Sequence, residues 1–219
     1  MRHLACREKE AVSDLSADVG LSRDMSENHT PLAHVAKDGR RQLLVDHLSG
    51  VESLARSFAG AFGAAECGAA VGRWHDLGKF SGDFQGMIHG ANGIEAHIET
   101  EGGPRDHSTA GAVLAASSFD DDLGYALAWC IAGHHAGLSD CANLIARLKR
   151  KADLLDGVRR KRPPAEVMNA PSAELNLPAW VDKKDDADYR LAFDLFVRLL
   201  FASLCDADFL DTEAFLQGE

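Results

Sequence analysis

The sequence places a histidine directly before an aspartate in the segment His75-Asp76-Leu77-Gly78-Lys79. A neutral imidazole and a carboxylate together suit transition metals better than calcium, which prefers oxygen ligands alone. The carboxylate of Asp76 could also bridge two cations, whereas a neutral imidazole cannot. Lys79 follows Asp76 by about one helical turn, where its ammonium group could hold a phosphate. Alone, the segment is more typical of a helix C-terminus with a surface ion pair than of a metal site.

Three further features strengthen the case for a metal site. His47 lies on the apolar face of a predicted helix. His134 and His135 are adjacent at the end of a very apolar helix, where each buried ring needs a polar partner. Asp206 and Asp208 follow another apolar run, and burying a carboxylate there is costly unless a cation or a strong donor meets it. Together these residues are typical of a ligand set.

The elements that must position these residues are predicted to be helices. Apolar residues recur at steps of three and four, which makes amphipathic stripes, and no strand pattern of convincing length appears. The fold class is therefore predicted to be all-α. The expected helices cover residues 44–62, 64–77, 81–89, 107–118, 123–135 and 140–155, and a last one runs from 189 towards 215.

The predicted domain organisation is a polar, loosely attached extension over residues 1–30 and one domain over residues 31–219. A glycine-rich loop is expected over residues 90–104. Within the domain, a long connection is expected over residues 156–188, because four prolines fall between Pro163 and Asp186 and little periodicity remains there.

The charge distribution is uneven. The formal net charge of −11 argues against a general nucleic-acid coat protein, because binding phosphates needs cations. One basic strip could nevertheless track a phosphate backbone, although it could also be an ordinary solvated helix face. It contains Arg147, Lys149, Arg150, Lys151, Arg159, Arg160, Lys161 and Arg162.

The remaining composition indicates a cytoplasmic protein. No apolar run is long enough to span a membrane, and the first residues lack the apolar core of a secretory signal. The five cysteines form no Cys-x-x-Cys pair, so we expect reduced, buried thiols rather than a zinc knuckle. They are Cys6, Cys67, Cys130, Cys141 and Cys205.

The order of the histidines and aspartates resembles that of the HD phosphohydrolase superfamily. The sequence around these residues is similar to that of the HD nuclease domain of the type I CRISPR-associated helicase-nuclease, from about His34 to Glu213. Five separated motifs carry the resemblance: Gln42-Leu43-Leu44-Val45-Asp46-His47-Leu48; His75-Asp76-Leu77-Gly78-Lys79-Phe80-Ser81 with Phe84-Gln85; Asp106-His107-Ser108 with Ala110-Gly111-Ala112; Gly133-His134-His135-Ala136-Gly137-Leu138; and Asp206-Ala207-Asp208-Phe209-Leu210-Asp211-Thr212-Glu213.

This resemblance implies an HD-domain helical bundle with a metal site in its core. One metal would be held by His47, His75, Asp76 and the late aspartate. Asp76 would bridge to a second metal held by His107, His134 and His135, with Lys79 beside the scissile phosphate. For the late aspartate we prefer Asp208, because Ala207-Asp208-Phe209-Leu210 matches the Ala-Asp-x-Leu setting of the superfamily, and Asp206 is the second choice.

The other histidines are assigned weaker roles. His34 stands where the family also tends to show a histidine, so it could lie at the edge of the site. The others are expected on the surface or in loops. They are His3, His29, His89 and His97.

The resemblance further implies two-metal cleavage of single-stranded DNA in type I CRISPR interference, an antiviral defence. The metals would be manganese, iron, cobalt or nickel, with magnesium also possible. The expected partners are single-stranded DNA, a CRISPR effector complex and a helicase, fused or separate, because the chain contains no Gly-x-x-x-x-Gly-Lys-Ser/Thr phosphate loop.

Two alternatives stay open from the sequence. The first is an HD-type phosphohydrolase of nucleotides or cyclic dinucleotides. The second is a non-catalytic module in which the metal cluster only stabilises the fold.

Overall fold

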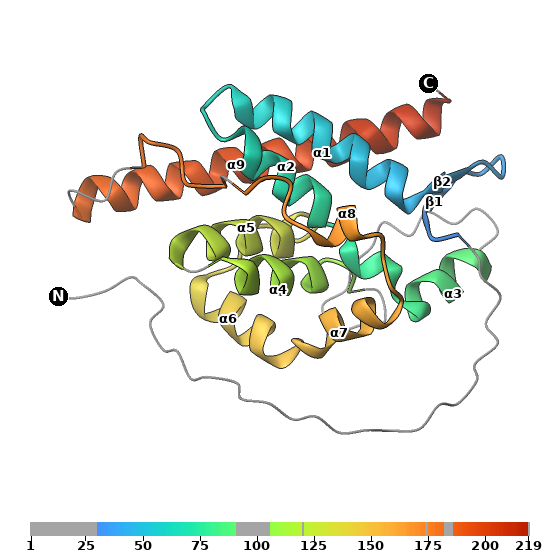
Figure 1. Cartoon of the computed structure of the whole chain (residues 1–219). Coiled ribbons are helices and arrows are strands. Elements are labelled where there is room, and N and C mark those ends of the chain that lie inside the picture. Colours follow the sequence, from blue (N-terminus) through green and yellow to red (C-terminus); the bar gives the residue numbers. More distant parts are fainter. Residues whose placement is uncertain (1–29, 91–105, 120, 174, 182–185, 219) are drawn as a thin grey trace. The chain divides into compact units, whose positions relative to one another are not determined.

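The computed structural model describes residues 30–90, 106–119, 121–173, 175–181 and 186–218. These residues confirm the all-α class, with one two-stranded sheet as the only strands described (Figure 1). The extension predicted over residues 1–30 and the loop predicted over 90–104 lie almost entirely outside the described residues. The elements are β1 (Leu32–Val35), β2 (Arg41–Leu43), α1 (Leu44–Gly60), α2 (Ala65–Trp74), the 3₁₀ helix η1 (Leu77–Phe80), α3 (Gly82–Gly90), α4 (Thr109–Ser118), α5 (Asp121–Gly133), α6 (Cys141–Arg150), α7 (Asp153–Arg160), α8 (Ala165–Met168) and α9 (Asp186–Gln217).

The bundle is built around α1, α2, α5 and α9. The predicted apolar stripe of α1 is confirmed, since Leu44, Leu48 and Val51 are fully or almost fully buried. The long helix α9 packs against α1, α2 and α5, and Figure 1 shows α9 and α1 side by side. Its buried face carries Phe196 and Leu200, which have no exposed surface. Burying such side chains contributes roughly 1.5–3 kcal/mol each, so this core fixes the helices from which the site is built.

The hairpin of β1 and β2 was not expected from the sequence. The two strands pair antiparallel, with His34 opposite Gln42. Each strand is too short to show an alternating pattern, and the turn between them depends on Gly39, whose φ of 89° favours glycine. The hairpin brings His34 against α9, where the His34 ring lies 6.4 Å from that of Phe215, centroid to centroid.

Several predicted boundaries differ from the structure. The helix expected over 140–155 is two helices, α6 and α7, because the backbone leaves the helical conformation at Lys151. The connection expected over 156–188 is shorter, since α7 extends to Arg160 and α9 begins at Asp186. Pro163 and Pro164 explain why α7 does not continue further, because proline has no N–H to donate and restricts the residue before it.

The second predicted helix also ends early. It was expected over residues 64–77, but α2 ends at Trp74 and the chain continues as η1. The amide of Gly78 donates to the carbonyl oxygen of His107, 2.9 Å away, and so joins η1 to the start of α4 rather than to the preceding turn. Among the described residues, no helix combines the length and the apolar character needed to cross a bilayer.

Candidate metal centre

The histidines and aspartates singled out from the sequence come from five different parts of the bundle. Their side chains meet in the core, where His47, His75 and Asp76 are almost completely inaccessible to solvent. The contributing positions are His47 on α1, His75 and Asp76 after α2, His107 before α4, His134 and His135 after α5, and Asp208 on α9.

The first set of ligand atoms surrounds one oxygen of Asp76. Nε2 of His47 and Nε2 of His75 are 3.2 Å apart, and each lies 3.4 Å from Asp76 Oδ2. Asp208 Oδ1 is 3.4 Å from the His47 nitrogen and 3.5 Å from the His75 nitrogen. Two ligand atoms bound to one ion at about 2.1 Å lie about 3.0 Å apart in octahedral and about 3.4 Å apart in tetrahedral coordination. The first set therefore has the spacing of metal ligands.

The second set surrounds the other oxygen of Asp76. Asp76 Oδ1 is 3.2 Å from Nε2 of His107 and 3.5 Å from Nε2 of His134. Nε2 of His135 is 3.0 Å from the same nitrogen of His107. One ligand atom from each of these four residues lies within 4.8 Å of all the others. Each carboxylate oxygen of Asp76 thus faces its own set of imidazoles, which is the arrangement of a bridging ligand.

Backbone carbonyls fix the orientation of two of the imidazoles. Nδ1 of His75 lies 2.8 Å from the carbonyl oxygen of Gly72, and Nδ1 of His134 lies 2.7 Å from that of Ile131. A carbonyl oxygen only accepts, so Nδ1 must donate. In the neutral ring, Nε2 then carries the free lone pair that a metal requires.

The electrostatics of the cluster suit cations. Burial alone would lower the pKa of His75, but Asp76 and Asp208 outweigh burial and raise it to about 10. The pKa of His47 is likewise raised to about 9 against the effect of burial, by Asp208, Asp211 and Asp76. The carboxylates therefore favour positive charge beside Asp76.

In the second set, by contrast, the pKa values of two imidazoles are lowered. Burial lowers the pKa of His107 to about 3 and, together with His134, lowers that of His135 to about 4, so both imidazoles are neutral at pH 7. Asp76 Oδ1 and His134 Nε2 are buried and have no hydrogen-bond partner among the described residues. Buried polar atoms without partners are unfavourable, and an ion between them would satisfy both. The residues present fit a metal.

The two candidate late aspartates differ in their position relative to the cluster. Asp208 is held beside His47 and His75, whereas Asp206 is exposed and belongs to none of the candidate ligand groups. The two are separated by about 200° around α9, so only one of them can face the cluster. The geometry supports Asp208 and leaves Asp206 out of the ligand set.

Asp211 is a site residue that the sequence reasoning missed. Its Oδ2 lies 2.7 Å from Nδ1 of His47 and also accepts from Nε2 of Gln42 at 2.8 Å. Gly50 makes room for it, since a Cβ at Gly50 would lie 1.9 Å from Asp211 Oδ1. The signal in the sequence is the spacing, because Asp211 lies one helical turn after Asp208 and so shares its face.

We expect Asp211→Asn to weaken binding of the first metal ion about 10- to 100-fold, because losing the carboxylate partner of a ligating histidine lowers its basicity and its orientation. The measurement is metal affinity by competition with a chelator. The matched control is Asp194→Asn, on the exposed face of the same helix, where the aspartate pairs with Arg198. An unchanged affinity in Asp211→Asn would rule out this role for Asp211.

Lys79 and His34 stand at the edge of the cluster. Nζ of Lys79 is 2.6 Å from Asp76 Oδ2 and 3.4 Å from the carbonyl oxygen of Ala33, and only 4% of Lys79 is exposed. The ring of His34 packs edge-on against that of His47, with centroids 4.8 Å apart. Burial and the nearby Lys79 and His47 lower the pKa of His34 well below its usual value, so this imidazole is neutral.

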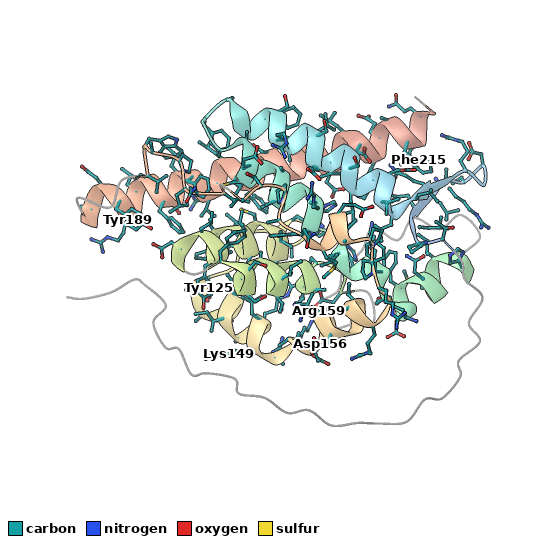
Figure 2. The ribbon with its side chains drawn as sticks, in the orientation of Figure 1. Tyr125, Lys149, Asp156, Arg159, Tyr189 and Phe215 are labelled. Atoms are coloured by element: carbon teal, nitrogen blue, oxygen red, sulfur yellow. The ribbon has the colours of Figure 1, made fainter. Side chains whose placement is uncertain are left out.

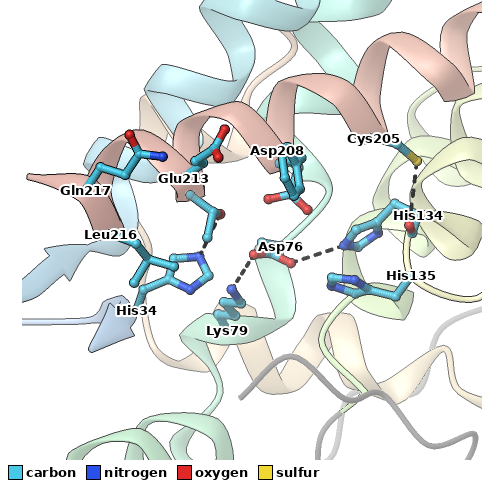
Figure 3. A pocket seen from close by; sticks show the side chains of 12 residues that line it. His34, Asp76, Lys79, His134, His135, Cys205, Asp208, Glu213, Leu216 and Gln217 are labelled. Atoms are coloured by element: carbon cyan, nitrogen blue, oxygen red, sulfur yellow. Dashed lines mark hydrogen bonds and ion pairs between the residues drawn. The ribbon is translucent and has the colours of Figure 1, made fainter. Parts of the chain in front are cut away.

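A cavity of about 590 Å³ gives access to the cluster (Figure 3). Figure 3 shows Lys79 and His134 directed at Asp76 from opposite sides, with Asp208 approaching from α9. The last turns of α9 form one wall of this cavity, and Glu213 and Gln217 contribute polar groups to it. Its volume is within the range of ordinary ligand sites.

Two cations of the predicted DNA-binding strip, Arg147 and Lys151, form hydrogen bonds and ion pairs with other residues of the chain. The guanidinium of Arg147 donates to Thr109 Oγ1 at 2.7 Å and to the carbonyl oxygen of Ala132 at 2.7 Å, and Lys151 forms an ion pair with Asp106. Arg147 also donates to Asp106 Oδ1 at 3.1 Å. Because Asp106 directly precedes His107, these contacts anchor the segment that carries a candidate ligand.

The partners of Asp106 also stabilise its charged form. Burial would raise the pKa of Asp106, but Lys151, Thr109 and Arg147 outweigh burial and lower it to about 2. Arg147 and Lys151 thus have partners within the protein, whereas the other six cations of the strip are exposed. These are Lys149, Arg150, Arg159, Arg160, Lys161 and Arg162.

A comparison with models of protein families identifies the family of this chain. The family model described as "Cas3, HD domain" matches residues 32–195, which is most of the chain. The chain belongs to this family. As a Cas3 HD domain it is a CRISPR-associated, metal-dependent HD nuclease or phosphohydrolase, and the resemblance read from the five motifs is confirmed. No curated protein matches the chain.

The Cas3 HD match covers four of the five contributing parts of the bundle. It includes His47, the His75-Asp76 pair, His107 and the His134-His135 pair, and it ends inside α9 before Asp208. The individual ligand roles remain predictions, which rest on the distances above.

Proposed function

We propose that this chain hydrolyses phosphodiester bonds of single-stranded DNA with two divalent metal ions bound around Asp76, in type I CRISPR interference. The observation that carries the proposal is the position of the Asp76 carboxylate between two sets of imidazoles. One oxygen faces His47 and His75, and the other faces His107 and His134. A site for one ion would not need ligand atoms on both sides of the same carboxylate.

His47, His75, Asp208 and Oδ2 of Asp76 would hold one ion, and His107, His134, His135 and Oδ1 would hold the other. When bound, two such ions activate water for attack and stabilise the charge that develops on the phosphate and on the leaving oxygen. The residues of the chain supply the rest. Asp211 orients the His47 ring, the carbonyl oxygens behind His75 and His134 set their tautomer, and Lys79 presents a cation at the cavity floor.

The depth of the site favours a single strand. Asp76 and Lys79 are only 1% and 4% exposed and lie at the bottom of the cavity. A flexible single strand can bend one phosphate into such a recess, whereas a phosphate of stacked and paired duplex DNA is held on a wide, rigid helix. Because the cluster would contact backbone phosphate rather than base edges, sequence preference should be weak.

The test is cleavage of circular single-stranded DNA in the presence of manganese, with duplex DNA and a cyclic dinucleotide as parallel substrates. We expect the single-stranded circle to be cut and the duplex to be spared. Hydrolysis of the cyclic dinucleotide alone would replace this proposal with the nucleotide-hydrolase alternative. Elemental analysis of the purified protein identifies which of manganese, iron, cobalt, nickel or magnesium it retains.

The proposed partners are a CRISPR effector complex, which exposes the displaced DNA strand, and a helicase that feeds this strand to the site. Membership of the Cas3 HD family supports a type I context with a helicase partner. The six exposed cations, which lie on α6, on α7 and directly after α7, offer a path for the strand backbone, and Figure 2 shows Lys149 at the edge of α6 away from α9.

Replacing Arg159, Arg160 and Arg162 together with alanine should weaken single-strand binding at low salt. If these three side chains contact phosphates, the slope of log K against log salt should fall by about 2, since each contact contributes about 0.7. Fluorescence anisotropy across a salt series measures this slope. The control is Arg198→Ala on α9, where the exposed arginine pairs with Asp194. An unchanged slope in the triple variant would remove the strip from the DNA path.

A further inference from the structure

The cavity over the metal cluster has two walls of different chemistry. The floor and one side are polar and charged, with Asp76, Lys79 and His134. The opposite side is α9, which contributes apolar side chains as well as polar ones. The apolar ones are Cys205, Phe209 and Leu216, and the polar ones are Asp208, Thr212, Glu213 and Gln217. The cationic Lys79 at the floor thus suits a phosphate, and the α9 wall adds some apolar surface within the same recess.

Phe209 is a largely exposed aromatic residue on the α9 wall of the cavity. Its side chain directly follows Asp208 in sequence, lines the cavity and is 65% exposed. A single exposed phenylalanine elsewhere on a surface would need no explanation. Here the ring borders the recess that leads to the candidate ligands, whereas the next residue, Leu210, is 43% exposed and does not line the cavity.

We propose that Phe209 is a stacking surface for the nucleobase next to the scissile phosphate. This inference rests on the proposed function and adds to it a residue that holds the substrate. A phosphate at the floor of the cavity leaves its attached nucleoside directed towards the cavity walls. Among the described residues that line the cavity, Phe209 is the one phenylalanine, tyrosine or tryptophan, whereas the exposed ring of His135 belongs to the candidate ligand set. Every base has a π-face, so stacking holds a strand without reading its sequence.

Stacking also suits the geometry of the ion sites. Sequence-independent cleavage needs the phosphate placed against the metals while the base varies, and an aromatic platform supplies this. A carboxylate or amide would instead select bases by their hydrogen-bonding edges. Glu213, one turn further along the same wall, can accept only from bases that offer a donor, so the ring of Phe209 is the base-tolerant contact.

The experiment compares two substrates of equal length, an oligodeoxythymidylate and a strand whose sugars carry no bases. Phe209→Ala should raise KM for oligodeoxythymidylate about 5- to 100-fold and leave kcat nearly unchanged, because stacking contributes equally before and during the reaction. For the abasic strand, Phe209→Ala should leave KM unchanged. Phe209→Trp should keep the KM for oligodeoxythymidylate near the wild-type value, because tryptophan also stacks. A purely structural role of Phe209 would not predict this.

The matched control is Leu191→Ala, an apolar residue on the same helix that is 71% exposed and does not line the cavity. It should leave KM for both strands unchanged. If wild-type protein cuts the strand but Phe209→Ala has the same KM, or raises KM equally for both strands, stacking by Phe209 is overturned while the nuclease proposal stands. If wild-type protein cuts neither strand, the nuclease proposal itself fails and the inference fails with it.

Discussion

Asp76→Asn is expected to abolish single-strand cleavage and to leave the protein without bridged metal ions. The substitution keeps the volume of the side chain but replaces one carboxylate oxygen with an amide nitrogen, which cannot bind a cation. Both candidate ion sites share this residue, at 3.4 Å from the His75 nitrogen and 3.2 Å from the His107 nitrogen. Since metal activation of water and charge stabilisation supply several kcal/mol, the rate should fall at least about 1000-fold.

The measurement combines a cleavage assay with elemental analysis of the purified variant. Asp76 also neutralises Lys79, and leaving a buried cation without its partner costs about 3–5 kcal/mol, so thermal unfolding must be recorded as well. The double variant Asp76→Asn with Lys79→Met removes this cation and separates loss of stability from loss of metal. The control Asp83→Asn alters an exposed aspartate of α3. A variant that keeps two ions and cuts at the wild-type rate would end the case for a bridging Asp76.

Gly78→Ala should disable the second ion site while leaving the first largely intact. A Cβ at Gly78 would lie 2.4 Å from the carbonyl oxygen and 2.6 Å from the Cα of His107, and both are backbone atoms that cannot rotate away. The start of α4 must therefore move, and His107 moves with it. A displacement of about 1 Å in a catalytic centre reduces the rate roughly 100-fold, and overpacking costs about 1–3 kcal/mol of stability.

The test of Gly78→Ala is metal stoichiometry together with the cleavage rate. The matched control is Gly86→Ala in α3, where a Cβ would have no atom within 4 Å. This control should be neutral or should raise stability by up to about 1 kcal/mol, because alanine favours the helix more than glycine does. Two bound ions and full activity in Gly78→Ala would mean that the backbone contact between η1 and α4 does not set the position of His107.

The sequence predicted those features that depend on local periodicity. The stripe of Leu44, Leu48 and Val51 identified α1 and its inner face, and helical spacing put His47 on that face. The preference for Asp208 rested on the Ala-Asp-x-Leu resemblance, and the structure agrees with it. Asp208 lies four and eight residues after the buried Leu204 and Leu200, whereas Asp206 falls on the exposed side of the helix. That the predicted ligands converge was read from motif order, and the distances now support it.

Features that depend on contacts distant in sequence could not be predicted. The partner of His47 is Asp211, and the anchor of Asp106 is Arg147, so each pair joins parts of the chain that are far apart in sequence. The sequence also could not show that Arg147 and Lys151, which were assigned to the DNA-binding strip, lie beside the partly buried carboxylate of Asp106. The hairpin was missed because strands of three and four residues are too short for a pattern of period two.

The continuity of α9 has a practical consequence for work with this protein. The segment that matches the family ends at residue 195, within the first third of α9, which runs from Asp186 to Gln217. A fragment trimmed to those limits would lose Phe196, Leu200 and Leu204 from the interior and expose the apolar surface they cover. It would also lack Asp208 and Asp211. Inactivity or precipitation of such a shortened chain would reflect where it was cut and would say nothing about the enzyme.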